Sequence, residues 1–360
     1  MSASRLLRYF YSPSRRSSSK IYQDLRSVRL SSLPLFDRDR LYCRMASTDA
    51  STQRRTQDAA ASPHIGVIGA GLSGLRCADI LLQCGFKVTV IEGRDRVGGR
   101  VHQQPLPNGH LVDLGPNWIH GTQDNPILDL VKQTNTAVGS WDTRSYVFGE
   151  SGDLFQVDQG EQYATMMWDI IQEAFKHSNK FCTTIDSGES LADFFQTKIA
   201  EKIPDTDHAF SEKRALLWQM SEMWGAFVGS PISRQSLKYF WLEECIEGEL
   251  VLRRYVQKVL DLVAQPVLAG AEVQFNSKVT RISHRDEGRD QVIVEMDGGQ
   301  SLHFDEVVVT CPLGWLQKNL SAFEPSLPPR LARAITSIGY GCLEKVYISF
   351  PRAFWLSQGA

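Results

Sequence analysis

The sequence predicts an α/β fold in which a second, mainly helical α+β domain is inserted into a domain with a parallel sheet. Residues 64–92 have the pattern strand, glycine turn, helix, strand. Residues 141–250 carry mainly helical patterns, and strand patterns return within residues 273–310. Strands that alternate with helices favour a parallel sheet, and the return of strands after a helical stretch indicates an insertion.

The first unit is built around a G-x-G-x-x-G turn. Residues 65–68 form a short apolar strand, and Gly69, Gly71 and Gly74 follow it directly. Gly69 permits the tight turn, Gly71 lets backbone approach a pyrophosphate, and Gly74 lets the next helix pack closely against the strand. The free N–H groups and the positive dipole end of that helix suit an anion. The turn therefore predicts a dinucleotide site.

An acidic residue stands where such a site needs one. Apolar residues recur at helical spacing over residues 75–82, Gly85 is placed to end the helix, and residues 87–91 alternate into a second strand. Glu92 closes that strand 23 positions after Gly69, where an acid accepts hydrogen bonds from ribose hydroxyls. A carboxylate there repels a 2′-phosphate, which argues against NADP. The alternative is an ordinary βα turn without a ligand.

Composition excludes several classes of protein. The chain has 360 residues, 42% of them hydrophobic, which is enough for two domains. Its net charge of −2 provides no basic stripe for nucleic acid, and no apolar run in the sequence reaches the roughly 18 residues of a transmembrane helix. Seven cysteines without a C-x-x-C pair favour a reducing compartment, and the spacing of the eight histidines predicts no metal site.

Residues 1–63 differ in composition from the rest. Through Ser19 there are four arginines and seven serines, and the first acidic residue is Asp24. This composition resembles a mitochondrial transit peptide, which implies a mitochondrial location. The alternatives are a disordered extension of a cytoplasmic protein, or translation from Met45.

The residues after Glu92 resemble a known family. E-x-R-x-R-x-G-G-R over residues 92–100 and D-L-G-P-N-W-I-H-G over residues 113–121 are similar to the flavin-dependent amine oxidases, most closely the polyamine oxidases. An NAD dehydrogenase would need no Gly-Gly-Arg after the acid. The resemblance implies a Rossmann-like, glutathione-reductase-like domain that binds FAD, formed by residues 64–140 and 251–318. It also implies a substrate domain, formed by residues 141–250 and a strand within residues 319–360.

The turn and the resemblance together give a set of residues expected to bind FAD. They are the glycines of the turn and the motif residues that match the family: Gly69, Gly71, Ser73, Gly74, Glu92, Arg94, Gly99, Arg100, Gly115, Asn117, Trp118 and Val279. For the arginines, a solvated charged surface is the alternative. One departure is Leu-Arg-Arg at residues 252–254, where relatives often carry a glycine-containing turn. It leaves open how this segment packs on the flavin domain.

Two residues are candidates for the chemistry. By resemblance, His120 faces the substrate beside the flavin ring, where an imidazole could orient an amine; a structural histidine is the alternative. Lys345 alternates with Val346 and Ile348 in a predicted strand, and spacing alone predicts that it is exposed to solvent. The match of G-x-G-x-L-x-K and F-x-x-x-F-W over residues 339–355 implies instead the family's active-site lysine, which holds a water near flavin N5.

Local patterns predict the remaining elements. In the helical stretch these are an apolar stripe over residues 163–174, a capping box at Ser190 and Asp193, and a helix over residues 216–228 that is rich in Trp and Met. Its aromatic residues predict a core, with a substrate tunnel as the alternative. An acidic group could attract a polycation or form a solvated surface: Glu243, Glu244, Glu247 and Glu249.

The last part of the sequence predicts a return to the first domain. We expect a helix over residues 255–267, a strand over residues 273–282 and a buried strand over residues 307–310. A hairpin is expected between residues 292–296 and 302–304, across Asp297 and Gly298.

The resemblance implies FAD-dependent oxidation of amines of the spermine and spermidine class, as in polyamine catabolism. A hydride passes from the carbon next to the amine nitrogen to flavin, the imine is hydrolysed, and oxygen is reduced to hydrogen peroxide. The partners implied are an amine and oxygen. Two alternatives stay open: a related flavoenzyme such as a protein-lysine demethylase, for which residues 1–63 offer no chromatin-binding domain, and an inactive nucleotide-binding product. Because the family continues beyond residue 360, we expect a truncated chain that retains FAD poorly. The sequence leaves the oligomeric state open.

Overall fold

A computed structural model describes residues 62–122, 125–140, 146–149, 151–243, 249–252, 256–285 and 291–353. These residues belong to one unit of the chain, which includes Ser62–Ala360. The predictions for residues 1–61, for residues 253–255 and for the F-W pair at residues 354–355 lie outside the described residues. So do those for Glu244 and Glu247.

A four-stranded parallel sheet organises the first part of the fold. Its strands are β1 (His64–Ile68), β2 (Lys87–Ile91), β8 (Glu272–Gln274) and β12 (Glu306–Val309), in the order β12-β1-β2-β8. All neighbouring pairs are parallel. Helix α4 (Leu72–Gln83) connects β1 to β2, and Gly85 follows it with φ +82°. The predicted order of strand, turn, helix and strand is confirmed, and with it the α/β fold.

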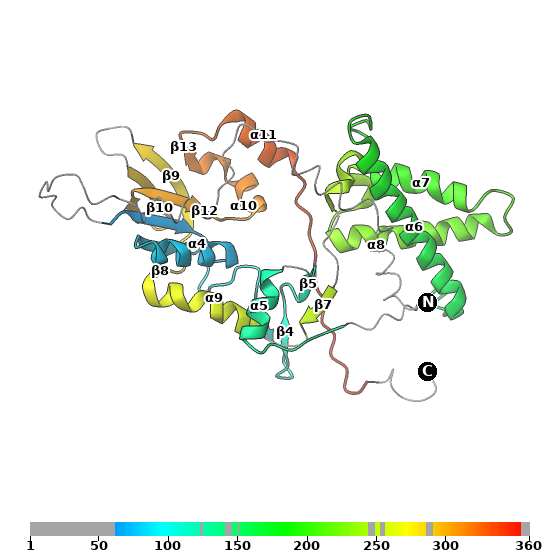
Figure 1. The fold of residues 1–360 in the computed structure, drawn as a ribbon, viewed down its shortest axis with the longest axis horizontal. Helices are drawn as coiled ribbons and strands as arrows, with labels where there is room; N and C mark the ends of the chain where they lie inside the picture. Colours follow the sequence, from blue (N-terminus) through cyan, green and yellow to red (C-terminus); the bar gives the residue numbers. More distant parts are fainter. Residues whose placement is uncertain are drawn as a thin grey trace, which may run out of the picture. The chain divides into compact units, whose positions relative to one another are not determined.

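Both faces of this sheet are covered, which explains the continuous apolar run of β1. On one face, Val67 and Val90 pack with α4 and with α9 (Val256–Gly270). On the other face, Ile68 and Ile91 pack with β9 (Val279–Arg285), β10 (Gln291–Met296) and β11 (Ser301–Phe304) (Figure 1). Each fully buried valine or isoleucine contributes about 1.5–3 kcal/mol, so these two cores hold the sheet in place.

The strands on the second face form a sheet of order β11-β10-β9-β13, with β13 at Phe323–Glu324. The predicted pairing of β10 with β11 is confirmed, with Val292 opposite Phe304. Its loop is longer than predicted. It runs over residues 297–300, closed by the Met296 N–H donating to Gln300 O, and both Gly298 and Gly299 have positive φ.

The single strand predicted over residues 273–282 is wrong. The structure has β8 and β9 instead, in two different sheets. Between them Asn276 has φ +54°, a left-handed conformation that asparagine tolerates, and its N–H donates to Arg94 O. A local turn therefore carries the chain from one sheet to the other, although the apolar pattern continues through it.

The strand expected to be buried at residues 307–310 lies at the edge of the parallel sheet. Val308 is 36% exposed, and its neighbours Val307 and Val309 are only partly buried. β12 pairs only with β1 in the described sheet. An edge strand lacks one neighbour, so its apolar run does not guarantee burial.

Between the two stretches of β structure lie α6 (Val157–Phe181), α7 (Leu191–Lys202) and α8 (Phe210–Val228), followed by η1 (Ile232–Arg234) and η2 (Leu237–Glu243). The predicted stripe on α6 buries Met167, Ile170 and Ala174, and the predicted capping box of Ser190 and Asp193 is present. Trp224 lies in an aromatic group with Phe175 and Phe240. These side chains support the core interpretation for Trp224, but Met223 and Phe227 on the same helix are exposed and do not fit it.

A small sheet of order β5-β7-β6 is formed by strands from before and after this helical stretch. It joins β5 (Trp118–His120) and β6 (Val138–Gly139) to β7 (Glu249–Leu252). The remaining elements are short: the pair β3 (Gln103–Pro105) and β4 (Leu111–Asp113), then α5 (Pro126–Gln133), α10 (Leu313–Lys318), η3 (Leu320–Ala322) and α11 (Pro329–Ser337). Within the described ranges, no helix is both long and apolar enough to cross a membrane.

Candidate functional site

The glycine turn between β1 and α4 combines one close approach with one open position. Gly69 has φ +105°, and its N–H donates to Ile91 O. A Cβ on Gly74 would lie 1.9 Å from Gly69 O, so the helix approaches the strand end as predicted. A Cβ on Gly71 would meet no atom within 4 Å. The turn therefore leaves space at Gly71, next to exposed Ser73 at the start of α4.

Glu92 connects this turn to the loop that follows β2. Glu92 is 8% exposed, and its carboxylate accepts from the Ala70 N–H at 2.8 Å and from the Arg94 N–H at 2.9 Å. The Glu92 carbonyl accepts from the Ser277 N–H, which brings the segment leading into Val279 beside it. Each carboxylate oxygen accepts more than one hydrogen bond, so these contacts leave acceptor capacity for a ligand hydroxyl.

The Gly-Gly-Arg loop lies against the glycine turn. The Gly98 N–H donates to Ala70 O at 2.8 Å, and a Cβ on Gly99 would lie 3.4 Å from the Gly71 Cα. Arg96, which was not predicted as a site residue, donates to Gly99 O at 3.0 Å and fixes the loop. The only sequence signal for that role is its place between Arg94 and Gly98.

The second motif, which is D-L-G-P-N-W-I-H-G over residues 113–121, lies against this loop. A Cβ on Gly115 would lie 2.0 Å from Arg100 O, so only glycine allows the two backbones to meet. The side chains of Arg94 and Arg100 are exposed, while Asn117 is partly buried. The turn, the acid, the Gly-Gly-Arg loop and residues 115–117 therefore form one continuous series of contacts.

Lys345 joins this series from 230 residues away in the sequence. Its Nζ donates to Gly115 O at 2.5 Å and to Asn117 Oδ1 at 2.7 Å, with Asp113 O at 3.5 Å. Burial lowers the pKa of Lys345, and the nearby Asp113 carboxylate opposes that shift. The expectation from spacing alone, that Lys345 is exposed to solvent, is wrong.

The predicted strand around Lys345 is also wrong. No strand is assigned to described residues 339–353. The alternating side chains are nevertheless sorted: Val346 is 84% exposed and Ile348 is 71% exposed, whereas Lys345 is partly buried. The side chains of Lys345 and Tyr347 face the second motif, where backbone oxygens accept their hydrogen bonds.

Trp118 and His120 lie next to each other on β5. Their rings are stacked with centroids 6.3 Å apart, and the His120 side chain is exposed. β5 pairs with β7, placing His120 opposite Glu249 in the register. Trp118 directly follows Asn117, which accepts from Lys345, so the aromatic pair lies beside the Lys345 contact along the chain.

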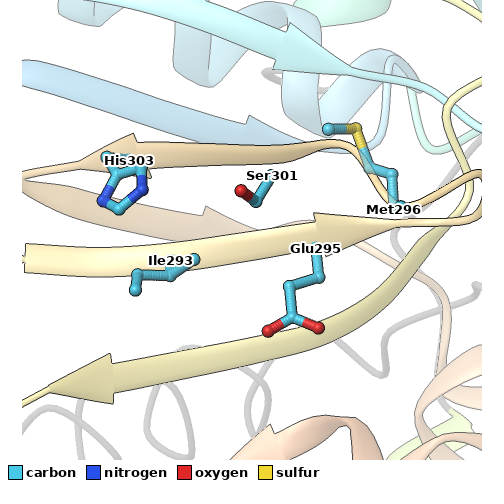
Figure 2. Close-up of a pocket in the computed structure, with 6 residues that line it drawn as sticks. Ile293, Glu295, Met296, Ser301 and His303 are labelled. Atoms are coloured by element: carbon cyan, nitrogen blue, oxygen red, sulfur yellow. The ribbon is translucent and has the colours of Figure 1, made fainter.

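A pocket elsewhere in the fold contains none of the predicted site residues. It lies on the β10–β11 hairpin, with a volume of about 320 Å³, and is lined by Ile293, Glu295, Met296, Gly299, Ser301 and His303 (Figure 2). In the described part of the chain, no group of three or more His, Cys, Asp or Glu could hold a metal ion.

The residues of the contact series fit a long anionic dinucleotide such as FAD. Helix α4 has no side-chain cap and no acidic residue in its first turn, so its N–H groups point at the open space beside Gly71. Glu92 supplies a carboxylate acceptor, and the arginines supply positive charge. This donor and acceptor set matches a phosphate flanked by a ribose.

Comparisons with known proteins agree with this chemistry. The chain matches the model of the flavin containing amine oxidoreductases over residues 72–359. It is 30% identical over 305 residues to probable polyamine oxidase 4 of Arabidopsis thaliana, covering 81% of this chain and 59% of that protein. It is 30% identical over 310 residues to polyamine oxidase 2 of the same plant, covering 82% and 60%.

A second group of relatives is named for a different activity. Lysine-specific histone demethylase 2 of Homo sapiens is 27% identical over 299 residues, which cover 82% of this chain and 36% of that protein. The chain spans about three fifths of the length of the polyamine oxidases that it matches.

Proposed function

Because the chain belongs to the family of flavin-containing amine oxidoreductases, whose cofactor is FAD, we propose that it oxidises amines of the polyamine class. The observation that carries the proposal is the contact of Lys345 with Gly115 and Asn117. It joins two distant motifs, each of which resembles the family, into one site. The identities to the two polyamine oxidases support the substrate class.

The contact series suggests which residues would hold FAD. The turn residues Gly69, Gly71, Ser73 and Gly74 would bind the pyrophosphate through backbone, and Glu92 would accept hydrogen bonds from ribose hydroxyls. Further contacts would come from the remaining members of the set: Arg94, Gly99, Arg100, Gly115, Asn117, Trp118 and the backbone of Val279. When bound, FAD supplies the acceptor for the hydride that leaves the carbon next to the amine nitrogen.

Lys345 and His120 are the proposed residues of the chemistry. The Lys345 ammonium is held by fixed oxygen acceptors, and its lowered pKa makes proton release easier than for a solvated lysine. It can therefore hold a water or move a proton at Nζ. The exposed imidazole of His120 can orient an amine nitrogen, and the ring of Trp118 lies nearly parallel to it.

We also propose that the domains divide as the sequence predicts. Residues 64–140 and 251–318 would form the FAD-binding domain, and residues 141–250 and 319–360 the substrate domain, except that β13 pairs with β9 and so belongs to a sheet of the FAD-binding domain. The pairing of β5 with β7 supports this division, because it closes the helical stretch at its two ends.

The test is whether the purified 360-residue chain, supplied with excess FAD because we expect it to retain the cofactor poorly, binds flavin that amines reduce. Gel filtration followed by absorbance gives the FAD stoichiometry. Anaerobic mixing with spermine or spermidine should bleach the flavin, and admitting oxygen should restore it with one hydrogen peroxide per turnover. Bound flavin that neither amine bleaches would contradict the proposal.

The second candidate is oxidation of a methylated lysine, which the similarity to the demethylase favours. The same anaerobic assay with a monomethyl-lysine peptide separates the two candidates. Bleaching by the peptide and not by spermine would replace the first proposal with the second.

A further inference from the structure

Three alternate side chains of residues 345–349 bond to the chain between residues 108 and 117. Lys345 donates to Gly115 O and Asn117 Oδ1, and the Tyr347 hydroxyl donates to Asp113 O at 2.5 Å. Ser349 accepts from Asn108 Nδ2 at 2.8 Å in the turn between β3 and β4. As the chain runs from residue 345 to 349, its partners run backwards from residue 117 to 108. The two segments therefore lie antiparallel, joined by side chains.

These side-chain bonds hold the segment in place. No strand is assigned to described residues 339–353, and the intervening Val346 and Ile348 are mostly exposed. A backbone bond from the Cys342 N–H to Gly229 O at 2.8 Å holds the start of the segment, and from there on the position of Lys345 depends on the polar contacts of its own face. Of those, the Tyr347 bond lies two residues along the segment from Lys345.

The Asp113 carbonyl is the acceptor that the two residues have in common. It lies 2.5 Å from the Tyr347 hydroxyl and 3.5 Å from Lys345 Nζ. A carbonyl oxygen can accept two hydrogen bonds, so the Tyr347 hydroxyl does not exclude the ammonium from Asp113 O. The Tyr347 bond instead ties the chain two residues from Lys345 to this carbonyl, which keeps Lys345 Nζ within reach of Gly115 O and Asn117 Oδ1. Without the hydroxyl, the segment loses this bond, and the ammonium can move away from Gly115 and Asn117 toward solvent.

We propose that Tyr347 is a positioning residue, whose hydroxyl ties its segment to Asp113 O and so holds the Lys345 ammonium against Gly115 and Asn117. The inference rests on the proposed function only for the role of Lys345 in amine oxidation. The positioning itself is a property of this chain and is measured without substrate.

The experiment is competitive acetylation of the 360-residue chain with acetic anhydride over a range of pH, quantified by mass spectrometry. It yields the pKa of each lysine and the reactivity of its deprotonated form. The test variant is Tyr347→Phe, which keeps the ring. The matched control is Tyr340→Phe on the same segment, since the Tyr340 ring lies against Gly314. Lys132, whose side chain is 77% exposed, is the internal reference.

In the parent chain, deprotonated Lys345 should react more slowly than Lys132. Tyr347→Phe should raise the reactivity of Lys345 about two- to tenfold, the range expected for loss of one hydrogen bond, and should move its pKa upward toward the ordinary lysine value. Tyr340→Phe should change neither quantity. Unchanged Lys345 in Tyr347→Phe, or an equal change in Tyr340→Phe, overturns the proposal.

A second measurement links the position of Lys345 to the chemistry. In the flavin-loaded chain, Tyr347→Phe should shift the pH profile of anaerobic flavin reduction by amine in the direction of the Lys345 pKa, with FAD stoichiometry unchanged. If no amine reduces the parent chain, the proposed function fails while the acetylation result still decides the positioning. A pH profile that stays in place while the acetylation pKa moves overturns the link to catalysis.

Discussion

The same substitution at two glycines of the turn should destabilise the chain at one position and leave its stability nearly unchanged at the other. In Gly74→Ala, the new methyl group would lie 1.9 Å from Gly69 O and 2.9 Å from Thr310 Oγ1. The first neighbour is a backbone atom and cannot rotate away, so helix α4 must move. In Gly71→Ala the methyl group would meet nothing within 4 Å, and φ −74° with ψ 175° suits any residue.

The magnitudes follow from two opposing effects. Overpacking of a well-packed site costs about 1–3 kcal/mol and sometimes more. Alanine gains up to about 1 kcal/mol over glycine in a helix. Because the contact in Gly74→Ala is with fixed backbone, we expect an overpacking cost at the upper end of this range, about 2.5–3 kcal/mol, and therefore a net loss of at least about 1.5 kcal/mol. Gly71→Ala gains about 0.4–1 kcal/mol from the unfolded chain but loses a favourable N-cap residue, so it should stay within about 1 kcal/mol of the parent.

Urea unfolding of the flavin-free chain, followed by circular dichroism, measures both variants. For a slope near 3 kcal/mol/M, Gly74→Ala should lower the midpoint by about 0.5 M or more, and Gly71→Ala should leave it nearly unchanged. A flavin titration tests the open space at Gly71. Gly71→Ala, although stable, should bind FAD more weakly than the parent, because the methyl group fills that space. Equal midpoints for Gly74→Ala and the parent would refute the close approach of helix and strand.

Three further predictions concern other parts of the site and sheet. Glu92→Gln should lower the free energy of unfolding by about 1.5–3 kcal/mol and weaken FAD binding. The reason is that glutamine carries no negative charge and has one side-chain oxygen, whereas the two oxygens of Glu92 each accept from a backbone N–H. Urea midpoints and a flavin titration check this. Lys345→Met should keep FAD bound and slow anaerobic reduction by amine, and reduction as fast as in the control Lys132→Met would argue against its role. Burial and the charge of Lys87 lower the pKa of His64, so protonation of this histidine favours the unfolded chain. The free energy of unfolding should therefore fall as the pH drops below the ordinary histidine value of 6.5. Urea unfolding at several pH values should show a weaker pH dependence of stability for His64→Gln than for the parent.

Local features of the fold could be predicted from the sequence because their causes are local. The turn after β1 needs glycine for a positive φ at Gly69 and for the close approach at Gly74, and both requirements are visible in the spacing. The capping box at Ser190 depends on residues three apart, and the β10–β11 hairpin on its turn residues. The roles of the individual site residues remain predictions.

Features that depend on distant partners were predicted incorrectly or missed. The apolar pattern over residues 273–282 continues through the turn at Asn276, because both resulting strands have an apolar face to bury. The pattern therefore does not show where one sheet ends and the other begins. The hydrogen bond from the Ala70 N–H to Glu92 was missed because the two residues lie 22 positions apart in the sequence.

The sequence by itself determined the parallel βαβ unit, the placement of Glu92 at its end and the two faces of the segment around Lys345. Only the tertiary structure decided which of those faces turns inward. Alternation separates Lys345 and Tyr347 from Val346 and Ile348, and hydrophobicity alone would bury the apolar pair. The carbonyl oxygens of Asp113 and Gly115 instead lie within reach of the polar pair. Partly buried carbonyls need donors, so the polar face packs against them and the valine and isoleucine remain exposed.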